Sequence, residues 1–299
     1  MQMSAKQAKN NMLTVIIPVY NREKELVRCL DSIAAQTLRP SRLIVVDDGS
    51  TDNSALVARN HHIGAEVVEG NHRGASAARN IGLDMVTTPW TMFFDSDDIM
   101  SPTHIESAMC LAGDDVDIVG WDFNRVSLRG GHRVLPFVTK DIAYQNIMHG
   151  ALSTLHYMCR TELFRKAGKW NPEISVWDDI ELGARLLALN PRIVKKPGIT
   201  VTTYVTEQSI TGTKWADKTD KFIIALDALG RTLNKRHKDW VDLKTAILAA
   251  DIIRENRDDG RRMLSRIEPM TLAVRLAYLY RFYGGRGTAR LFRPFFSKD

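Results

Sequence analysis

Residues 13–50 read LTVIIPVYNREKELVRCLDSIAAQTLRPSRLIVVDDGS and contain three patterns in succession. The opening LTVIIPVY is a short β-branched apolar run, which predicts a buried strand. The following REKELVRCLDSIAAQ places apolar side chains at helical spacing, namely Leu26, Cys29, Leu30 and Ile33. SRLIVVDDGS is a second apolar run that ends in a turn signature. A strand, a helix and a strand in this order predict one unit of a parallel sheet.

The same alternation continues to about residue 125. It predicts strands in AEVVEG, WTMFF and VDIVGWDF, and helices in GASAARNIGLDMV and PTHIESAMCLA. From 126 to 212 the pattern is looser, with a hairpin around Gly130 and Gly131, a short helix in RTELFRKAG and an amphipathic helix in VWDDIELGARLLALN. The chain beyond is expected to be helical. We therefore predict an α/β fold with a mostly parallel sheet, helices on both of its faces and a C-terminal helical region.

The composition is typical of a soluble globular protein, with 44% apolar and 25% charged residues among 299. No apolar run approaches the roughly 18 residues that span a bilayer, and the polar N-terminus lacks the apolar stretch of a secretory signal. Cys29, Cys110 and Cys159 are an odd and widely spaced set. They predict buried thiols of a reducing compartment, not a disulfide framework or a zinc site. We expect the chain to be cytoplasmic.

Polar loops follow each of the first four predicted strands: PVYNRE, DDGSTD, EGNHRGASAARN and DSDD. In an open parallel sheet, ligands bind outside the carboxyl ends of the strands. The spacing of Asp95 and Asp97 lets both side chains point the same way, and oxygen ligands suit Mg²⁺ or Mn²⁺. The alternative is that these acids cap a helix that begins near Ser101 and Pro102.

The loop from Asn71 to Asn80 has Gly74 at a predicted helix start and Arg79 one turn further on. Arg79 could reach an anionic ligand or hold neighbouring carboxylates in place. The alternative is an ordinary loop-to-helix cap with a surface arginine. DDGSTD, taken by itself, indicates only a β-turn that carries acidic and hydroxyl side chains.

Four segments together carry more information than any of them alone. TVIIPVYNREKELVRCLDSIAAQT, LIVVDDGSTDNS, NHRGASAARNIGL and FFDSDD, in this order and spacing, closely resemble the family 2 glycosyltransferases of the GT-A fold. The resemblance is dense over about residues 13 to 100 and looser to about residue 212. It implies a Rossmann-like GT-A catalytic domain over residues 12–212 that binds a nucleotide-sugar. A disordered segment, 1–11, would precede it and a helical, basic region, 213–299, would follow.

The resemblance implies a nucleotide-binding site in the first loops, where the nucleotide is most often UDP. The residues that it assigns to the base, the nucleoside and the ribose are Pro18, Tyr20, Asn21, Glu23, Asp48, Asn71, Arg79, Asp95 and Ser96. Asp97 would ligate a Mn²⁺ or Mg²⁺ ion that bridges the diphosphate.

Enzymes of this kind usually invert the anomeric centre, which requires a base to deprotonate the acceptor hydroxyl. The family's usual Glu-Asp pair is here Asp178-Asp179 in VWDDIEL, with Asp179 as the expected base and Asp178 as a sugar or acceptor contact. The alternative is acidic capping of a helix N-terminus. EQSIT (207–211) lacks the histidine that many relatives carry in a loop over the diphosphate, and His156 is the nearest substitute. The Q-x-x-R-W motif of processive synthases is absent, which favours transfer of one sugar at a time.

The net charge of +6 is concentrated in residues 254–299, which hold eleven Lys or Arg against five Asp or Glu. Residues 270–296 also interleave arginine with Leu, Tyr and Phe, a pattern suited to an anionic membrane surface. The alternatives are a solvated helical face, packing on the catalytic domain or a homodimer interface. No nucleic-acid-binding module is recognisable, so we expect no nucleic acid.

We therefore expect an inverting, metal-dependent glycosyltransferase that acts on a glycan or lipid-linked acceptor in cell-surface polysaccharide synthesis, peripheral to the inner face of the cytoplasmic membrane. One rival is an inactive relative that serves as a scaffold. A second rival is a sugar nucleotidyltransferase, which would carry a glycine-rich, basic phosphate loop where this chain has PVYNRE.

Overall fold

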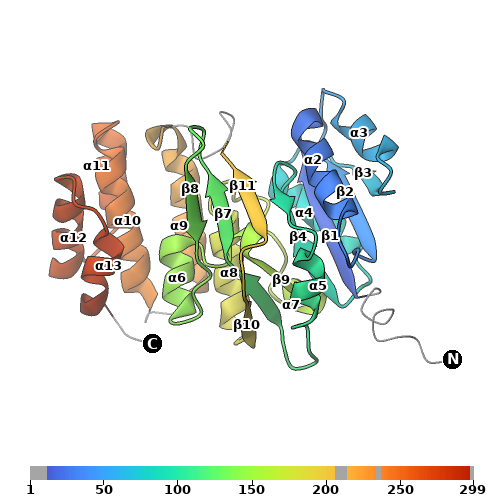
Figure 1. Cartoon of the computed structure of the whole chain (residues 1–299). Helices are drawn as coiled ribbons and strands as arrows, with labels where there is room; N and C mark the ends of the chain where they lie inside the picture. Colours follow the sequence, from blue (N-terminus) through green and yellow to red (C-terminus); the bar gives the residue numbers. More distant parts are fainter. Residues whose placement is uncertain (1–11, 206–213, 234–236, 297–299) are drawn as a thin grey trace.

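The protein is described by a computed structural model that covers residues 12–205, 214–233 and 237–296 (Figure 1). The expected disordered segment 1–11, the domain boundary near residue 212 and the EQSIT loop lie outside the described residues.

A seven-stranded sheet forms the centre, in the order β10-β6-β9-β4-β1-β2-β3. All neighbouring strands run parallel except β9, which is antiparallel to both β4 and β6. The prediction of a mostly parallel sheet is therefore confirmed. The strands are β1 (Leu13–Val19), β2 (Arg42–Asp47), β3 (Glu66–Glu69), β4 (Trp90–Phe93), β6 (Ile118–Trp121), β9 (Tyr157–Arg160) and β10 (Ile193–Lys196).

The register brings the carboxyl ends of the first strands to one edge. Val19 of β1 lies opposite Asp47 of β2, and Ile16 lies opposite Phe93 of β4. The amide of Asp48 donates to the carbonyl of Val19 at 2.8 Å, so the pairing continues one residue past β2. The polar loops predicted at the strand ends therefore share one edge of the sheet.

Helices cover both faces of this sheet, as predicted. Val15 and Ile17 of β1 pack in one core, and Ile16 packs in another, because successive side chains of a strand alternate between faces. The first face is covered by α2 (Glu23–Ala34), α3 (Ser54–Asn60) and α5 (His104–Met109). The second face is covered by α4 (Ala75–Asp84), α7 (Thr161–Lys166) and α8 (Asp178–Ala188).

A second sheet has four strands, and its strand β5 directly follows the acidic segment FFDSDD. It consists of β5 (Ile99–Met100), β11 (Val201–Tyr204), β7 (Phe123–Val126) and β8 (His132–Leu135), in that order. The predicted hairpin around Gly130 is confirmed, with β7 and β8 antiparallel. Because β5 separates Asp98 from α5, and Thr103 rather than an acid is the N-cap of α5, the acids of FFDSDD are not helix caps.

The cysteines differ in part from the prediction. Cys29 and Cys159 are buried and carry free thiols, whereas Cys110 is exposed at the end of α5. The helix ends at Met109, three residues before the end of the predicted helical segment PTHIESAMCLA, which leaves Cys110 at the C-cap.

The C-terminal region is helical, as expected, with α9 (Thr219–Thr232), α10 (Lys238–Ile252), α11 (Arg257–Leu264), α12 (Leu272–Phe282) and α13 (Thr288–Phe292). Ile180 of α8 packs in one core with Phe222 of α9, and Ile147 of α6 (Ile142–His149) packs with Leu243 of α10. The helix α8 thus lies between the main sheet and the C-terminal helices. No helix in the described ranges has the length and apolar character required to cross a bilayer.

Candidate active site

A cavity of about 460 Å³ lies at the carboxyl ends of β1, β2 and β4. Seven of the predicted residues line it, together with five that were not predicted; the full lining is Pro18, Val19, Tyr20, Arg22, Asp48, His72, Gly74, Ala75, Arg79, Asp95, Ser96 and Asp97. A larger hollow of about 690 Å³ lies elsewhere, against α6 and α8. It is bordered by Leu233 and His237, which flank residues 234–236 outside the described chain, and it contains no carboxylate cluster. The smaller cavity is therefore the candidate site.

Asn21 and Glu23 do not line the cavity, which corrects their expected place beside the base. The Asn21 Oδ1 accepts from the amide of Thr51 at 2.8 Å, and the Glu23 Oε2 accepts from the amide of Asn53 at 3.1 Å. Their side chains therefore point toward the loop that follows β2. The backbone amides of this loop precede a helix and have no partner within it, so the two side chains accept from them. Both side chains thus join the first two loops.

Tyr20 and His72 form one wall of the cavity. Their ring centroids lie 4.7 Å apart, and the tyrosine side chain is partly exposed. An aromatic surface of this kind can stack on a nucleobase. His72 has no counterpart among the predicted residues, and its only signal in the sequence is its place beside Asn71.

Asp48 holds the loop that precedes α4. Its carboxylate accepts from the amides of Arg73 at 3.1 Å and Gly74 at 2.7 Å. Gly74 has a φ of 90°, a conformation that favours glycine. Asn71, in the same loop, is exposed and lies outside the cavity lining, contrary to its expected place. Each carboxylate oxygen has two lone pairs, so Asp48 retains acceptor capacity toward the cavity.

Arg79 connects the two halves of the site. Its guanidinium donates to Asp95 Oδ1 and to Asp178 Oδ2, each at 3.0 Å, and lies 4.5 Å from the ring centroid of Trp170. Only 7% of this residue is exposed, so the alternative of a surface arginine is wrong. Burial lowers the pKa of Arg79, but the charges of Asp95 and Asp178 outweigh burial and keep the pKa above its ordinary value. Ser76 also donates to Asp178, at 2.8 Å.

Asp179 follows Asp178 in the first turn of α8. Burial and the neighbouring charge of Asp178 raise the pKa of Asp179 to about 7. Among the described residues, its Oδ1 accepts from the adjacent amide of Ile180 alone, at 2.8 Å, while Asp178 is bound to Arg79 and Ser76. The helix-capping alternative therefore does not describe Asp178. A carboxylate with a pKa near neutrality can accept a proton under physiological conditions.

Two residues beside this acidic pair were missed by sequence reasoning. Trp177 immediately precedes α8 with a φ of 57°, a strained conformation for a bulky residue. The Lys244 ammonium of α10 lies 4.0 Å from the centroid of that tryptophan and donates to the carbonyl of Ile147 at 2.6 Å. Burial lowers the pKa of Lys244 to about 7, against the opposing charge of Asp179. In the sequence, Lys244 could have been singled out as a lysine inside the apolar pattern of α10.

The acidic tip, residues 95–98 after β4, contains acids that line the cavity and one acid that is buried beside β11. Asp97 lines the cavity, and burial together with the charge of Asp95 raises its pKa to about 6. Asp98 is buried and hydrogen-bonds to Thr203 and Tyr204 of β11, although its Oδ1 has no partner among the described residues. Negative charge at Asp95 and Asp97 is thus incompletely compensated. Oxygen donors with excess charge fit a divalent ion such as Mg²⁺ or Mn²⁺.

His156 does not substitute for the missing loop histidine, because it lies outside the cavity lining. Its Nδ1 is 2.8 Å from the carbonyl of Trp121, and its ring packs against Phe123 and Phe137. Burial lowers its pKa to about 4. It is a neutral residue of the core.

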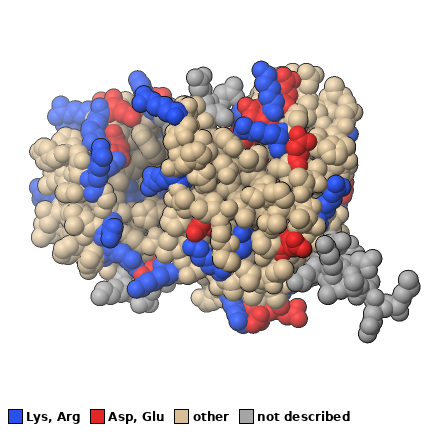
Figure 2. All heavy atoms as spheres, viewed as in Figure 1, with Lys and Arg blue, Asp and Glu red and all other residues tan. Residues whose placement is uncertain are grey.

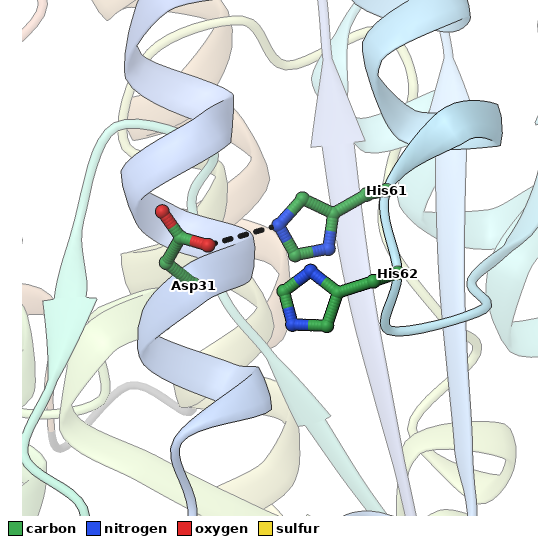
Figure 3. Close-up of side chains that lie close together, drawn as sticks. All are labelled: Asp31, His61 and His62. Carbon is green, nitrogen blue, oxygen red and sulfur yellow. Dashed lines mark hydrogen bonds and ion pairs between the residues drawn. The ribbon is translucent and has the colours of Figure 1, made fainter.

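A separate cluster lies on the surface between α2 and the turn after α3 (Figure 3). Asp31 Oδ1 is 3.1 Å from His61 Nε2, and the rings of His61 and His62 lie 4.4 Å apart. The other nitrogen of His61 accepts from the amide of Ile63 at 3.3 Å. Because both nitrogens of His61 are engaged, the contact joins α2 to the turn without a metal ion.

Replacement of Arg79 by Gln is expected to lower the free energy of unfolding by about 3 kcal/mol, because Asp95 and Asp178 lose their shared partner. The estimate is at the lower end for a buried pair, since 32% of the Asp95 side chain remains exposed. Urea unfolding measures the change. Arg73→Gln, at an exposed position in the preceding loop, is the matched control and should cost less than about 0.5 kcal/mol. Equal losses in the two variants would contradict the role of Arg79.

Comparison with known proteins agrees with this geometry. The sequence model described as Glycosyl transferase family 2 matches residues 14–167. The glycosyltransferase YibD of Escherichia coli is 37% identical over 112 residues, which are 36% of this chain and 33% of YibD. GlyG of Streptococcus pneumoniae is 30% identical over 151 residues, which are 47% of this chain and 50% of GlyG. The matched part thus spans half or less of these relatives.

Solved structures share the fold across nearly the whole chain. Staphylococcus aureus TarS 1–349, solved with UDP-GlcNAc, has a TM-score of 0.66 at 18% identity and covers 96% of this chain and 93% of its own. The mannosyltransferase PcManGT of Pyrobaculum calidifontis, solved with GDP-Man and Mn²⁺, has a TM-score of 0.60 at 16% identity and covers 94% and 83%. With the family match over half of its length, the chain belongs to glycosyl transferase family 2 and has the GT-A fold.

Proposed function

We propose that this protein transfers one sugar from a nucleotide-sugar to a hydroxyl of a glycan or lipid-linked acceptor, with inversion at the anomeric carbon. The observation that carries this proposal is the pair of hydrogen bonds from Arg79 to Asp95 and to Asp178. Through these two bonds Arg79 sets the position of the cavity, where the donor would bind, relative to Asp179, the proposed base. Cell-surface polysaccharide synthesis is the process in which we propose such a reaction.

The donor in this proposal is a UDP-sugar. A base would lie against Tyr20 and His72, with the free lone pairs of Asp48 accepting from the ring N–H of uracil. Asp95 would meet the ribose, with Ser96 beside it in the same lining. The complexes with UDP-GlcNAc and with GDP-Man are properties of TarS and PcManGT, so uracil is proposed for this chain from the family resemblance.

Asp97, assisted by Asp95, is the proposed ligand of a Mn²⁺ or Mg²⁺ ion. The raised pKa of Asp97 supports this, because a bound cation would offset the charge that burial leaves uncompensated. When bound, the ion would offset the negative charge that develops on the leaving diphosphate. The residues of the chain supply the rest of the chemistry.

Asp179 would take the proton of the acceptor hydroxyl while the hydroxyl oxygen bonds to the anomeric carbon and the bond to the diphosphate breaks. Its pKa of about 7 leaves a large share of the carboxylate unprotonated near neutral pH. Asp178 is held by Arg79 and Ser76, which leaves its second oxygen for a sugar or acceptor hydroxyl. The scaffold alternative does not account for two carboxyl groups with pKa values raised toward neutrality.

Titration with UDP, GDP and dTDP tests the donor and the metal together. We expect UDP to bind in the presence of Mn²⁺, and EDTA to weaken binding by at least about tenfold, equivalent to 1.4 kcal/mol. Asp97→Asn should remove the difference between Mn²⁺ and EDTA. Asp114→Asn, an exposed carboxylate after α5, is the control and should behave as the wild type. Equal UDP binding with Mn²⁺ and with EDTA would contradict the proposed metal site. If no nucleotide binds, the result would favour the scaffold alternative.

Asp179→Asn is expected to reduce transfer by a factor of about 10² to 10⁴, the usual contribution of a general base. UDP binding, measured by calorimetry, should remain at the wild-type value because Asp179 lies outside the cavity lining. Loss of UDP binding in step with activity would show that Asp179 has a structural role instead.

The pH dependence of kcat/KM supplies an independent test of the base. Because Asp179 must be unprotonated to act and its pKa is raised to about 7, activity should rise with pH through about 7. Asp178→Asn removes the neighbouring negative charge and should move this rise to lower pH. Lys244→Met removes a positive charge, present below its pKa of about 7, and should move the rise to higher pH. Shifts in the same direction would contradict the assignment.

A further inference from the structure

The helix α12 exposes an apolar stripe along its outer side. Leu272, Leu276 and Leu279 recur at intervals of four and three residues, and Tyr283 follows one turn later. The exposed fractions at the two ends of the stripe are 73% for Leu272 and 81% for Tyr283. Side chains at these intervals lie on one side of a helix. The stripe is therefore continuous, unlike the scattered apolar residues of an ordinary surface.

The other side of α12 is already buried. Val274 and Ala277 are fully buried in the core that also contains Leu243 of α10. Leu272 and Tyr283, the most exposed apolar residues of the outer side, are 73% and 81% exposed and therefore contribute little to the packing of α12 on the protein. Two more exposed apolar residues follow along the chain: Leu291 in α13 and Phe295 just after α13, which are 52% and 70% exposed. We call the exposed apolar residues between 272 and 295, with the arginines between them, the tail face.

The tail face is strongly basic. Residues 270–296 contain five arginines and no aspartate or glutamate. Arg275, Arg286 and Arg290 are exposed and form no ion pair with a described residue, whereas Arg281 is bound to Asp251 at 2.9 Å. Figure 2 shows Lys and Arg outnumbering Asp and Glu over the end of the molecule that Figure 1 assigns to the C-terminal helices. In the sequence of residues 272–291 the arginines alternate with the exposed leucines and tyrosines.

Of a second copy of the chain, a nucleic acid and a lipid surface, the lipid surface matches both properties. A second copy of the chain would place two basic faces without acids against each other, which like-charge repulsion opposes. A nucleic acid would satisfy the arginines but would leave the leucines in contact with phosphates and water. An anionic lipid surface offers head groups to the arginines and acyl chains to the leucines.

We propose that the tail face binds the surface of an anionic membrane. The helix α12 packs on α10, which also carries Lys244 beside the acidic pair of the candidate site. Membrane binding would therefore hold the site in a fixed relation to the bilayer, where a lipid-linked acceptor would lie. The contact needs no donor and no transfer reaction, so it stands independently of the proposed function.

The test is flotation of the full-length protein with vesicles of phosphatidylcholine alone and vesicles that also contain phosphatidylglycerol. We expect binding to the anionic vesicles that weakens as salt is added, because salt screens the attraction to head groups. The double substitution Leu276→Gln and Leu279→Gln should reduce the partition coefficient at least about tenfold through lost apolar contact. Arg275→Gln with Arg286→Gln should reduce it by about fivefold per arginine and should flatten the salt dependence.

The matched control is Leu128→Gln with Arg129→Gln, an exposed leucine and arginine in the turn between β7 and β8. This variant should bind vesicles as the wild type does, and circular dichroism should show that all variants fold. Absence of wild-type binding, or equal losses in the control, would overturn the proposal. Sedimentation that shows a dimer abolished by the leucine substitutions, without vesicle binding, would instead identify a second copy as the partner. UDP binding and transfer in solution are measured separately, so either proposal can fail alone.

Discussion

The buried guanidinium of Arg79 is the contact on which the candidate site depends. An arginine that is 7% exposed needs its charge compensated, and its two acidic partners come from opposite parts of the chain. Asp95 follows β4, whereas Asp178 begins α8, 99 positions after Arg79. The single positive charge of Arg79 is shared by two carboxylates, so each acid depends on the position of the other. The central sheet and α8 must therefore both be packed correctly before the charges of the site are satisfied.

The helix α8 extends this constraint to the C-terminal region. One side of α8 packs on the main sheet through Leu182 and Leu186, and the other packs on α9 through Ile180 and Ala184. The first turn is held further by Trp177, whose ring lies 4.0 Å from the ammonium of Lys244. The family match ends at residue 167, before the acidic pair. In this protein the C-terminal helices thus pack against α8, which carries the acidic residues of the candidate site that lie beyond the matched region.

The sequence predicted those features that depend on local pattern. Strand runs, helical spacing and the turn at Gly130 depend on neighbouring residues, and the structure confirms them. It did not predict that β9 would lie antiparallel between β4 and β6, since this pairing joins distant segments. It also placed Glu23 in the cavity, where the structure turns it toward the amide of Asn53, 30 positions away. A side chain pairs with a backbone amide that lacks another partner, and in this case folding brings the two together from distant parts of the chain.

The balance of charge in the cavity explains why the acidic tip and the base belong to one arrangement. The lining contains Arg22 and Arg79 as cations against Asp48, Asp95 and Asp97 as anions. Arg79 already shares its single positive charge between Asp95 and Asp178, so little of that charge is left to neutralise an added diphosphate. A nucleotide diphosphate would bring further negative charge into a cavity where burial already raises the pKa of Asp97 to about 6. A divalent cation at Asp97, as proposed above, would remove this conflict and would leave Arg79 to position Asp178, beside the carboxylate proposed to take the proton.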